Sequence, residues 1–196
     1  ALPIFALEFH RLVARDLTGR FVLGPRSGEL GAAAGEDRLL AAAAPALSAL
    51  RDATGESAQL YRRQGDLRIC VAVAERLSGL RDSVPVGAAL TMQAGSAAQI
   101  LLAWEDSEKI HRGLTNARFT AAQLSADRRR GWAQSVGERE AGVASVSAPV
   151  RAPNGKVIAA VSISGPIERL GRQPGRIHAA AVVATAARLT EHLARE

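Results

Sequence analysis

The chain has 196 residues, of which 47% are hydrophobic and 22% are charged, so we expect one soluble globular domain of ordinary size with a short appendage. Because aromatic residues make up only 4% of the chain, small and medium aliphatic side chains must fill the core. No stretch approaches the apolar length of a membrane span. The net charge of +6 favours a polyanionic partner such as DNA, although an Arg-rich composition gives the same balance without any such role.

The cysteine content and the N-terminal sequence both indicate a cytoplasmic protein. Cys70 is the only cysteine, which excludes an intramolecular disulfide and a cysteine-rich zinc cluster. No basic segment precedes an apolar block and a cleavage site, so we expect no export signal. Because the first residue is Ala1, either the initiator methionine has been removed or the chain begins within a longer protein.

The N-terminal part of the chain predicts a helix followed by a hairpin. Residues 2–10 are typical of the end of a short helix. Residues 12–15 and 20–23 are β-prone runs on either side of a turn that contains Gly, which predicts a β-hairpin. The Gly- and Ala-rich residues 26–35 are expected to form a linker.

The middle of the chain predicts a helix and a second hairpin. Residues 36–53 have helical periodicity, and Pro45 within them should kink the helix or divide it in two. Residues 59–62 and 67–73 are strand-like runs that predict a second hairpin, and residues 77–92 are expected to be irregular.

The C-terminal half predicts further helices around a third hairpin. We expect a clear helix at 96–104 and one or two polar helices within 105–131. The third hairpin pairs 143–150 with 157–164, and a long Ala-rich helix covers 176–195. Antiparallel strands with helices gathered on one side predict an α+β fold.

The third hairpin carries a polar face. Alternate residues of a strand share a face, so residues 157–164 have one apolar side and one side that becomes polar toward its end. A two-residue turn, or a four-residue Pro-Asn-Gly-Lys loop, pairs residue 153 with 156, whereas a three-residue loop would slip the register. That register places two pairs of serines opposite each other: Ser145 with Ser164, and Ser147 with Ser162. Four hydroxyls on one patch can bind a polar ligand, but a solvent-exposed face would explain the serines as simply.

Small residues also mark the start of the helix at 96–104. The first N–H groups of a helix have no partner within the helix and carry partial positive charge, so a carboxylate can bind there. Gly95, Ala97 and Ala98 would leave room for it, and Ser96 is a plausible N-cap residue. The alternative is that Ser96 only caps the helix and the alanines only pack tightly.

The chain shows no recognisable catalytic or metal-binding motif, so we expect neither an enzyme nor a metal or other cofactor. The histidines lack the spacing of metal ligands: His10, His111, His178 and His192. Cys70, between apolar residues of a strand, is interpreted as an inert buried side chain rather than a reactive thiol. Glu138 and Glu140 are interpreted as surface charges of a loop. The run Arg128–Arg130 is expected to be a solvated face, with phosphate contact as the alternative.

Three stretches together resemble the IclR family of bacterial transcription regulators. LEFHRLVARDLTGRFVLGPR (7–26) resembles the passage from the recognition helix of a winged helix-turn-helix into its wing and linker. VGAALTMQAGSAAQILLAW (86–104) is similar to the family's effector-domain signature. The most specific match is residues 130–170, which include Ser162-Ile163-Ser164-Gly165-Pro166. The resemblance covers nearly the whole chain.

The resemblance implies two parts, a partial winged helix-turn-helix at 1–31 and a GAF-like effector-binding domain at 32–196. In such a domain, an antiparallel sheet with helices on one side carries a ligand pocket closed by loops. The implied polar pocket positions are Gly95, Ser96, Ala97, Ser135 in a loop, Ser145, Ser162 and Ser164. The implied apolar wall consists of Leu80, Val84, Leu90, Met92 and Val143. Family members that bind small keto acids have Asp at the Ser135 position and Cys at the Ser145 position, so the identity of the effector does not carry over.

The resemblance further implies a ligand-responsive DNA-binding regulator, either a repressor or an activator. A small carboxylic or aromatic acid would bind the effector domain and change DNA affinity through a homodimer or homotetramer. Arg15 and Arg20 of the wing would contact DNA phosphates. The family's first two helices and most of its recognition helix have no counterpart in the matching stretch. The alternative is a stand-alone small-molecule sensor that acts on a partner protein without touching DNA.

Overall fold

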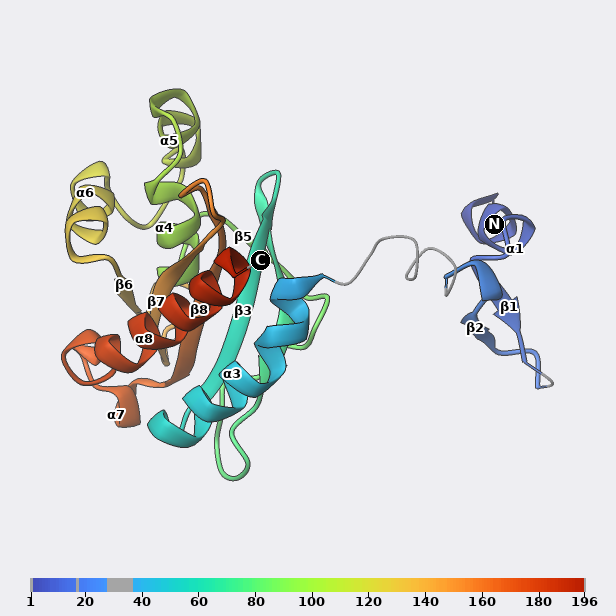
Figure 1. Cartoon of the computed structure of the whole chain (residues 1–196), viewed down its shortest axis with the longest axis horizontal. Helices are drawn as coiled ribbons and strands as arrows, with labels where there is room; N and C mark the ends of the chain where they lie inside the picture. Colours follow the sequence, from blue (N-terminus) through green and yellow to red (C-terminus); the bar gives the residue numbers. More distant parts are fainter. Residues whose placement is uncertain (1, 17, 28–36, 196) are drawn as a thin grey trace. The chain divides into compact units, whose positions relative to one another are not determined.

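The computed structural model describes residues 2–16, 18–27 and 37–195, which form two compact units separated near residue 41 (Figure 1). Most of the expected linker at 26–35 lies outside the described residues, and the expected domain boundary after residue 31 stays a prediction.

The N-terminal unit contains the expected helix and hairpin. Helix α1 (Leu2–Phe9) is followed by strands β1 (Val13–Arg15) and β2 (Phe21–Leu23), which pair antiparallel. The carboxylate of Asp16 accepts hydrogen bonds from the backbone N–H and the hydroxyl of Thr18 and from the backbone N–H of Arg20, at 2.8, 2.6 and 3.0 Å. These bonds fix the turn and lower the pKa of Asp16.

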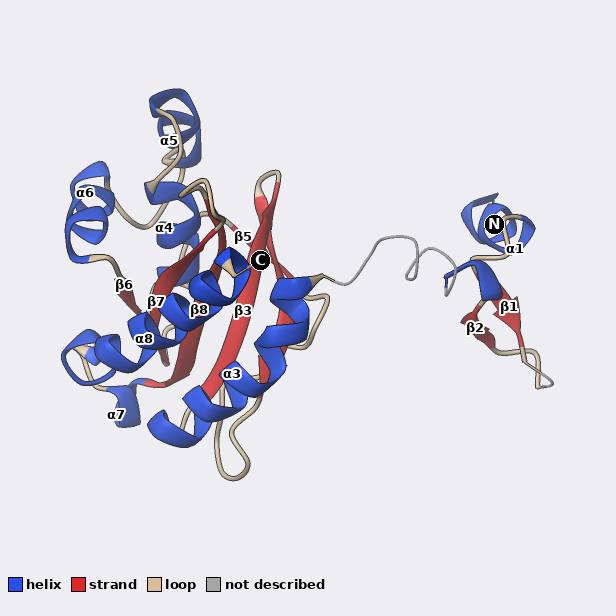
Figure 2. Ribbon diagram, in the orientation of Figure 1, coloured by secondary structure: helices blue, strands red, loops and turns tan. Residues whose placement is uncertain are grey.

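The second unit is built on one antiparallel sheet, drawn in red in Figure 2. Within residues 37–195 its strands are β3 (Ser57–Gln64), β4 (Leu67–Ala74), β5 (Ala89–Thr91), β6 (Ala133–Val136), β7 (Val143–Arg151) and β8 (Val157–Pro166). Their spatial order is β5-β4-β3-β8-β7-β6, so the second and third predicted hairpins lie side by side through β3 and β8. Strands β5 and β6 fall where the sequence predicted irregular chain.

Helices cover the sheet, which confirms the predicted α+β class. They are α3 (Arg38–Thr54), α4 (Ser96–Ala103), α5 (Ser107–Gly113), α6 (Ala121–Arg130), α7 (Ile167–Leu170) and α8 (Pro174–Ala194). Pro45 lies inside α3 without ending it, so of the two expected effects, a kink or a division into two helices, the division is wrong. The long helices α3 and α8 run across the near side of the sheet in Figure 1, and α4 packs against the other face of β7 and β8.

The core follows the alternation of the strands. On β8, Val161 and Ile163 are fully buried on one face, opposite Ala148 and Val146 of β7. The other face contributes Tyr61, Cys70 and Ala160 to a cluster with the apolar side chains of α4. Because both faces are covered, the serines on the second face are enclosed rather than exposed to solvent.

The register of the third hairpin is confirmed, but by a different turn. Ser145 pairs with Ser164, and Ser147 pairs with Ser162. The backbone N–H of Ala152 donates to the carbonyl of Lys156 at 2.9 Å, so the loop has three residues rather than two or four. Ile158 has no partner on β7 and forms a β-bulge in β8. The bulge shifts the register by one residue and so restores the pairing of the serines, which a three-residue loop alone would spoil.

Candidate functional site

A small cavity lies between the start of α4 and strands β3, β4, β6, β7 and β8. Its volume is about 20 Å³, which is enough for about one water molecule. Most of the residues that were expected to form the polar pocket line this cavity: Gly95, Ser96, Ala97, Ser135, Ser145 and Ser162. Val143 of the expected apolar wall is also in the lining. The serine-bearing strands and the start of α4, which the sequence indicated separately, therefore line the same cavity.

The serine hydroxyls form a continuous chain of hydrogen bonds. The hydroxyl of Ser96 lies 2.7 Å from that of Ser145 and 2.7 Å from that of Ser147, and Ser147 donates to Ser162 at 2.9 Å. Ser96 is thus tied to the sheet and does not cap its helix. The N-cap residue is Gly95, with φ of 96° and no side-chain cap, which corrects the sequence-based interpretation.

Gly95 lets a buried guanidinium reach the helix start. Its positive φ favours glycine, and a Cβ atom at this position would lie 3.2 Å from Nη2 of Arg68. Any larger residue would therefore be strained and would press on Arg68. The glycine is needed for the cavity's geometry as well as for the turn.

Arg68 is a site residue that the sequence analysis missed. Its side chain lines the cavity at only 3% exposure, and burial lowers its pKa to about 10, so it stays charged at neutral pH. One of its terminal nitrogens donates to the carbonyl of Thr91. Its Nε has no hydrogen-bond partner among the described residues. Arg68 lies on the same face of β4 as Cys70. Because Cys70 was expected to be buried, the sequence could have indicated that Arg68 is buried too.

Tyr61 and Arg139 complete the lining. The ring of Tyr61 lies 5.6 Å from the guanidinium carbon of Arg68, and burial raises the pKa of its hydroxyl. Arg139 donates to both carboxylate oxygens of Asp82 at 2.6 Å, which raises its pKa against the effect of burial. Two guanidinium groups beside a helix start and a row of hydroxyls make a site suited to an anion.

Glu138 is not the surface charge that the sequence suggested. Its carboxylate accepts hydrogen bonds from the backbone N–H of Gly95 at 2.9 Å and from the side-chain amide of Gln99 at 2.9 and 3.1 Å. Burial raises its pKa, although these bonds oppose the shift. A carboxylate of the protein itself therefore lies at the start of α4, where the sequence predicted that the carboxylate of a ligand would bind.

Five of the residues expected in the pocket lie outside this lining. Ser164 is buried and accepts a hydrogen bond from the side-chain amide of Gln59 at 2.9 Å. Leu80 is 73% exposed, whereas Val84 is buried and Leu90 packs against the α4 cluster. Met92 lines a different groove. Ser135, which does line the cavity, lies in strand β6 rather than in a loop.

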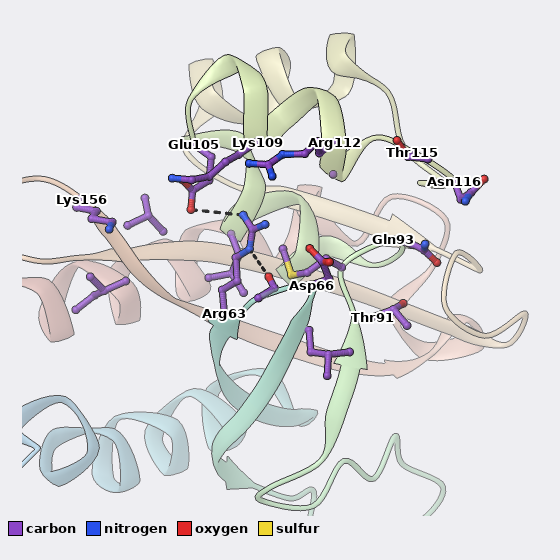
Figure 3. A pocket seen from close by; sticks show the side chains of 17 residues that line it. Arg63, Asp66, Thr91, Gln93, Glu105, Lys109, Arg112, Thr115, Asn116 and Lys156 are labelled. Atoms are coloured by element: carbon purple, nitrogen blue, oxygen red, sulfur yellow. Dashed lines mark hydrogen bonds and ion pairs between the residues drawn. The ribbon is translucent and has the colours of Figure 1, made fainter.

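That second groove is larger and more open, with a volume of about 880 Å³ (Figure 3). Charged side chains of β3 and α5 border it, and they pair with one another. Arg63 and Lys109 both contact Glu105, at 3.4 and 3.0 Å. None of the predicted polar pocket residues lies there, so the serine cavity is the candidate site.

Other candidate chemistry is absent from the described residues. Cys70 is buried, and burial raises the pKa of its thiol to about 11, as expected for an inert side chain. Across residues 2–16, 18–27 and 37–195 no cluster of three or more His, Cys, Asp or Glu could hold a metal ion. In the same ranges no helix combines the length and the apolar character that crossing a membrane requires.

The two arginines expected to contact DNA lie at the turn of the N-terminal hairpin. Arg15 donates to Glu8 at 3.0 Å and to the carbonyl of Gly19 at 3.1 Å, and it stacks on Phe21. The side chain of Arg20 is 79% exposed and pairs with Asp16 at 3.3 Å.

All three residues of the run Arg128–Arg130 are exposed, as expected for a solvated face. Arg128 donates to the backbone carbonyls of Ala103 and Glu105, and Arg130 pairs with Asp127. Arg128 thereby also joins α6 to the end of α4, and Arg130 is paired within α6.

Comparison with known proteins places this fold in one class, the bacterial regulators of transcription. Residues 32–191 match the family model for the C-terminal domain of IclR bacterial transcriptional regulators, so the chain belongs to the IclR family. The relatives are regulators rather than enzymes, as the sequence predicted. A comparison with curated proteins gave no match.

Solved structures of the family have the same fold. An IclR-type regulator from Silicibacter sp. TM1040 is 25% identical, with a TM-score of 0.82 over 98% of this chain and 82% of that one. A regulator from Alicyclobacillus acidocaldarius is 25% identical, with a TM-score of 0.79 over 96% and 82%. The IclR protein of Thermotoga maritima, at 20% identity and a TM-score of 0.77 over 98% and 83%, supports the fold alone.

Proposed function

We propose that this regulator responds to a small carboxylic or aromatic acid that binds in the serine cavity. The observation that carries the proposal is the meeting of a buried, incompletely bonded Arg68 with the hydroxyl chain of Ser145, Ser96 and Ser162. A guanidinium holds a carboxylate through charge-assisted hydrogen bonds, and hydroxyls accept or donate to the remaining polar atoms of a ligand.

The carbon part of the acid would contact Val143 and Tyr61, which line the cavity. Val84 and Met92 belong to the same buried cluster as α4, and Leu90 packs against that cluster. They would join the apolar wall if the cavity widens around its ligand. Leu80 is exposed and would join it only if its own loop moves inward.

The effector would act by changing DNA affinity through a homodimer or homotetramer. A coupling of about 1–3 kcal/mol between the two sites is enough for a useful switch. Arg15 and Arg20 would contact phosphates from the hairpin turn. Such a role places the protein in the cytoplasm with its DNA.

A thermal-shift screen of small carboxylic and aromatic acids, followed by calorimetry, tests the acid site. We expect at least one acid to stabilise the wild-type chain, because a ligand that binds the folded state raises the melting temperature. Ser145→Leu, which fills the cavity, should abolish this stabilisation. Ser125→Leu is the matched control, since Ser125 is exposed on α6 and does not line the cavity, and it should respond like wild type. An equal response from both variants would contradict the proposal.

A further inference from the structure

The cavity is too small for the ligands that it would bind. Its volume of about 20 Å³ holds about one water molecule. An organic acid needs several times this space, so some part of the lining must move when an acid enters. The question is which part of the lining moves.

The segment 137–142 is the part of the wall that is held by polar contacts rather than by the core. It carries Arg139, which lines the cavity, and Glu138, which reaches the start of α4. Arg118 donates to the backbone carbonyl of Glu138 at 2.6 Å, and Asp82 accepts from Arg139 at 2.6 Å. The segment lies between β6 and β7 and adds no strand or helix of its own, so moving it breaks fewer backbone hydrogen bonds than moving the sheet or α4 would.

Glu138 occupies the atoms that a ligand's carboxylate would need. Its two oxygens accept from the N–H of Gly95 and the amide of Gln99, at 2.9 to 3.1 Å. Arg68 lies next to Gly95 on the cavity side. Its exposed fraction is only 3%, and its Nε has no hydrogen-bond partner among the described residues. A second carboxylate could not share Gly95 with Glu138 without placing two negative charges in contact.

We propose that Glu138 is an internal competitor that holds the effector cavity closed, and that a small carboxylate ligand displaces it together with the segment 137–142. The ligand then takes the hydrogen bonds of Gly95 and Gln99 and brings its charge next to Arg68. This inference rests on the proposed acid site and adds the device that regulates access to it. The protein alternates between a closed form, with its own carboxylate on α4, and an open form that accepts the ligand.

The closed form lowers the apparent affinity for any acid by the fraction of molecules that are open. Removal of Glu138 should therefore tighten binding. We expect Glu138→Ala to bind acetate or benzoate about tenfold more tightly than wild type in isothermal titration of the full chain. Glu138→Gln keeps the shape but loses the charge, so it should give a smaller gain. Glu140→Ala removes an exposed carboxylate from the same segment, one that pairs with Arg139 and does not line the cavity, and it should bind like wild type.

Amide hydrogen exchange provides a readout without a ligand. The N–H of Gly95 should exchange at least about fivefold faster in Glu138→Ala than in wild type, with β7 and β8 unchanged, because its acceptor is gone. If the acids bind wild type and Glu138→Ala equally and Gly95 exchange is unchanged, the internal competitor is refuted while the acid site stands. If neither protein binds any acid of the screen, the acid site and this inference both fail, whatever the exchange rates.

Discussion

At the scale of single residues, the site depends on polar groups that are buried but not fully bonded. The serine chain from Ser145 to Ser162 is satisfied internally, whereas Arg68 keeps one nitrogen without a partner in the described part of the chain. A buried polar group without a partner costs about 1–3 kcal/mol. A ligand that supplies the partner recovers part of this cost, which is a physical reason for Arg68 to favour an anion.

Asp127 is a second buried group of this kind, and it predicts a pH effect on stability. Burial raises its pKa to about 6, even though Arg130 pairs with it at 2.6 Å, and its Oδ2 has no described partner. The folded state therefore holds this proton more tightly than the unfolded state. The destabilisation from ionising Asp127 is fully present above pH 6 and is relieved as the pH falls toward 4.

Asp127→Asn should remove this dependence, because an amide does not titrate. Between pH 4 and pH 7 the free energy of unfolding should decline less for the variant than for wild type. The two declines should differ by up to about 3 kcal/mol, because each unit of pKa shift corresponds to about 1.4 kcal/mol. Urea unfolding of both proteins at the two pH values measures the difference. Identical pH profiles for wild type and variant would show that Asp127 ionises normally in the folded protein.

At the scale of elements, glycines set how closely helices approach their neighbours. Gly175 lies in the first turn of α8, where an added Cβ would overlap the ring of Trp132. Its backbone N–H donates to the side-chain oxygen of Gln134 at 3.0 Å, which joins α8 to β6. The absence of a side chain at this position is therefore what lets the long helix dock against the edge of the sheet.

Gly175→Ala should lower the free energy of unfolding by about 1–3 kcal/mol, since the clash outweighs the gain of about 1 kcal/mol that alanine brings to an exposed helix. Gly142→Ala is the control, because nothing lies near its added Cβ, and it should change stability by no more than about 0.5 kcal/mol. Chemical denaturation of the two variants measures both. A stabilised Gly175→Ala would mean that Trp132 moves aside without cost.

The longer elements and the serine register were predictable from the sequence because their patterns are strong. Alternation identified β7 and β8, and small residues after Gly95 identified the start of α4. Strands β5 and β6 were missed because three and four residues are too few to show a period.

The site was predictable only where a single hairpin or a single helix start carried it. The serines on two adjacent strands could be placed by register. Arg68, Tyr61 and Glu138 come from three other segments, and their meeting depends on the order of the strands and on the path of the loop at 137–142. No local pattern contains that information. The family resemblance, which compares sequences position by position, also gave no indication of Glu138.

At the scale of the whole molecule, the proposed regulator must join ligand binding to DNA contact. The side chain of Arg20 is 79% exposed at the hairpin turn and is a candidate for phosphate contact. Arg20→Ala should weaken binding to random-sequence duplex DNA and lower the slope of log K against log salt by about one. Arg129→Ala makes the same charge change on α6 of the other unit and serves as the control. Equal losses from both variants would mean that only net charge matters.

The sheet ends on its two shortest strands, β5 and β6, of three and four residues. The outer edge of such a strand has unpaired backbone N–H and C=O groups, which can form hydrogen bonds with an extended segment of another chain. Here β5 and β6 are much shorter than β4 and β7, the strands with which they pair. Short outer strands therefore make this sheet less open to edge-to-edge pairing with another copy than long outer strands would.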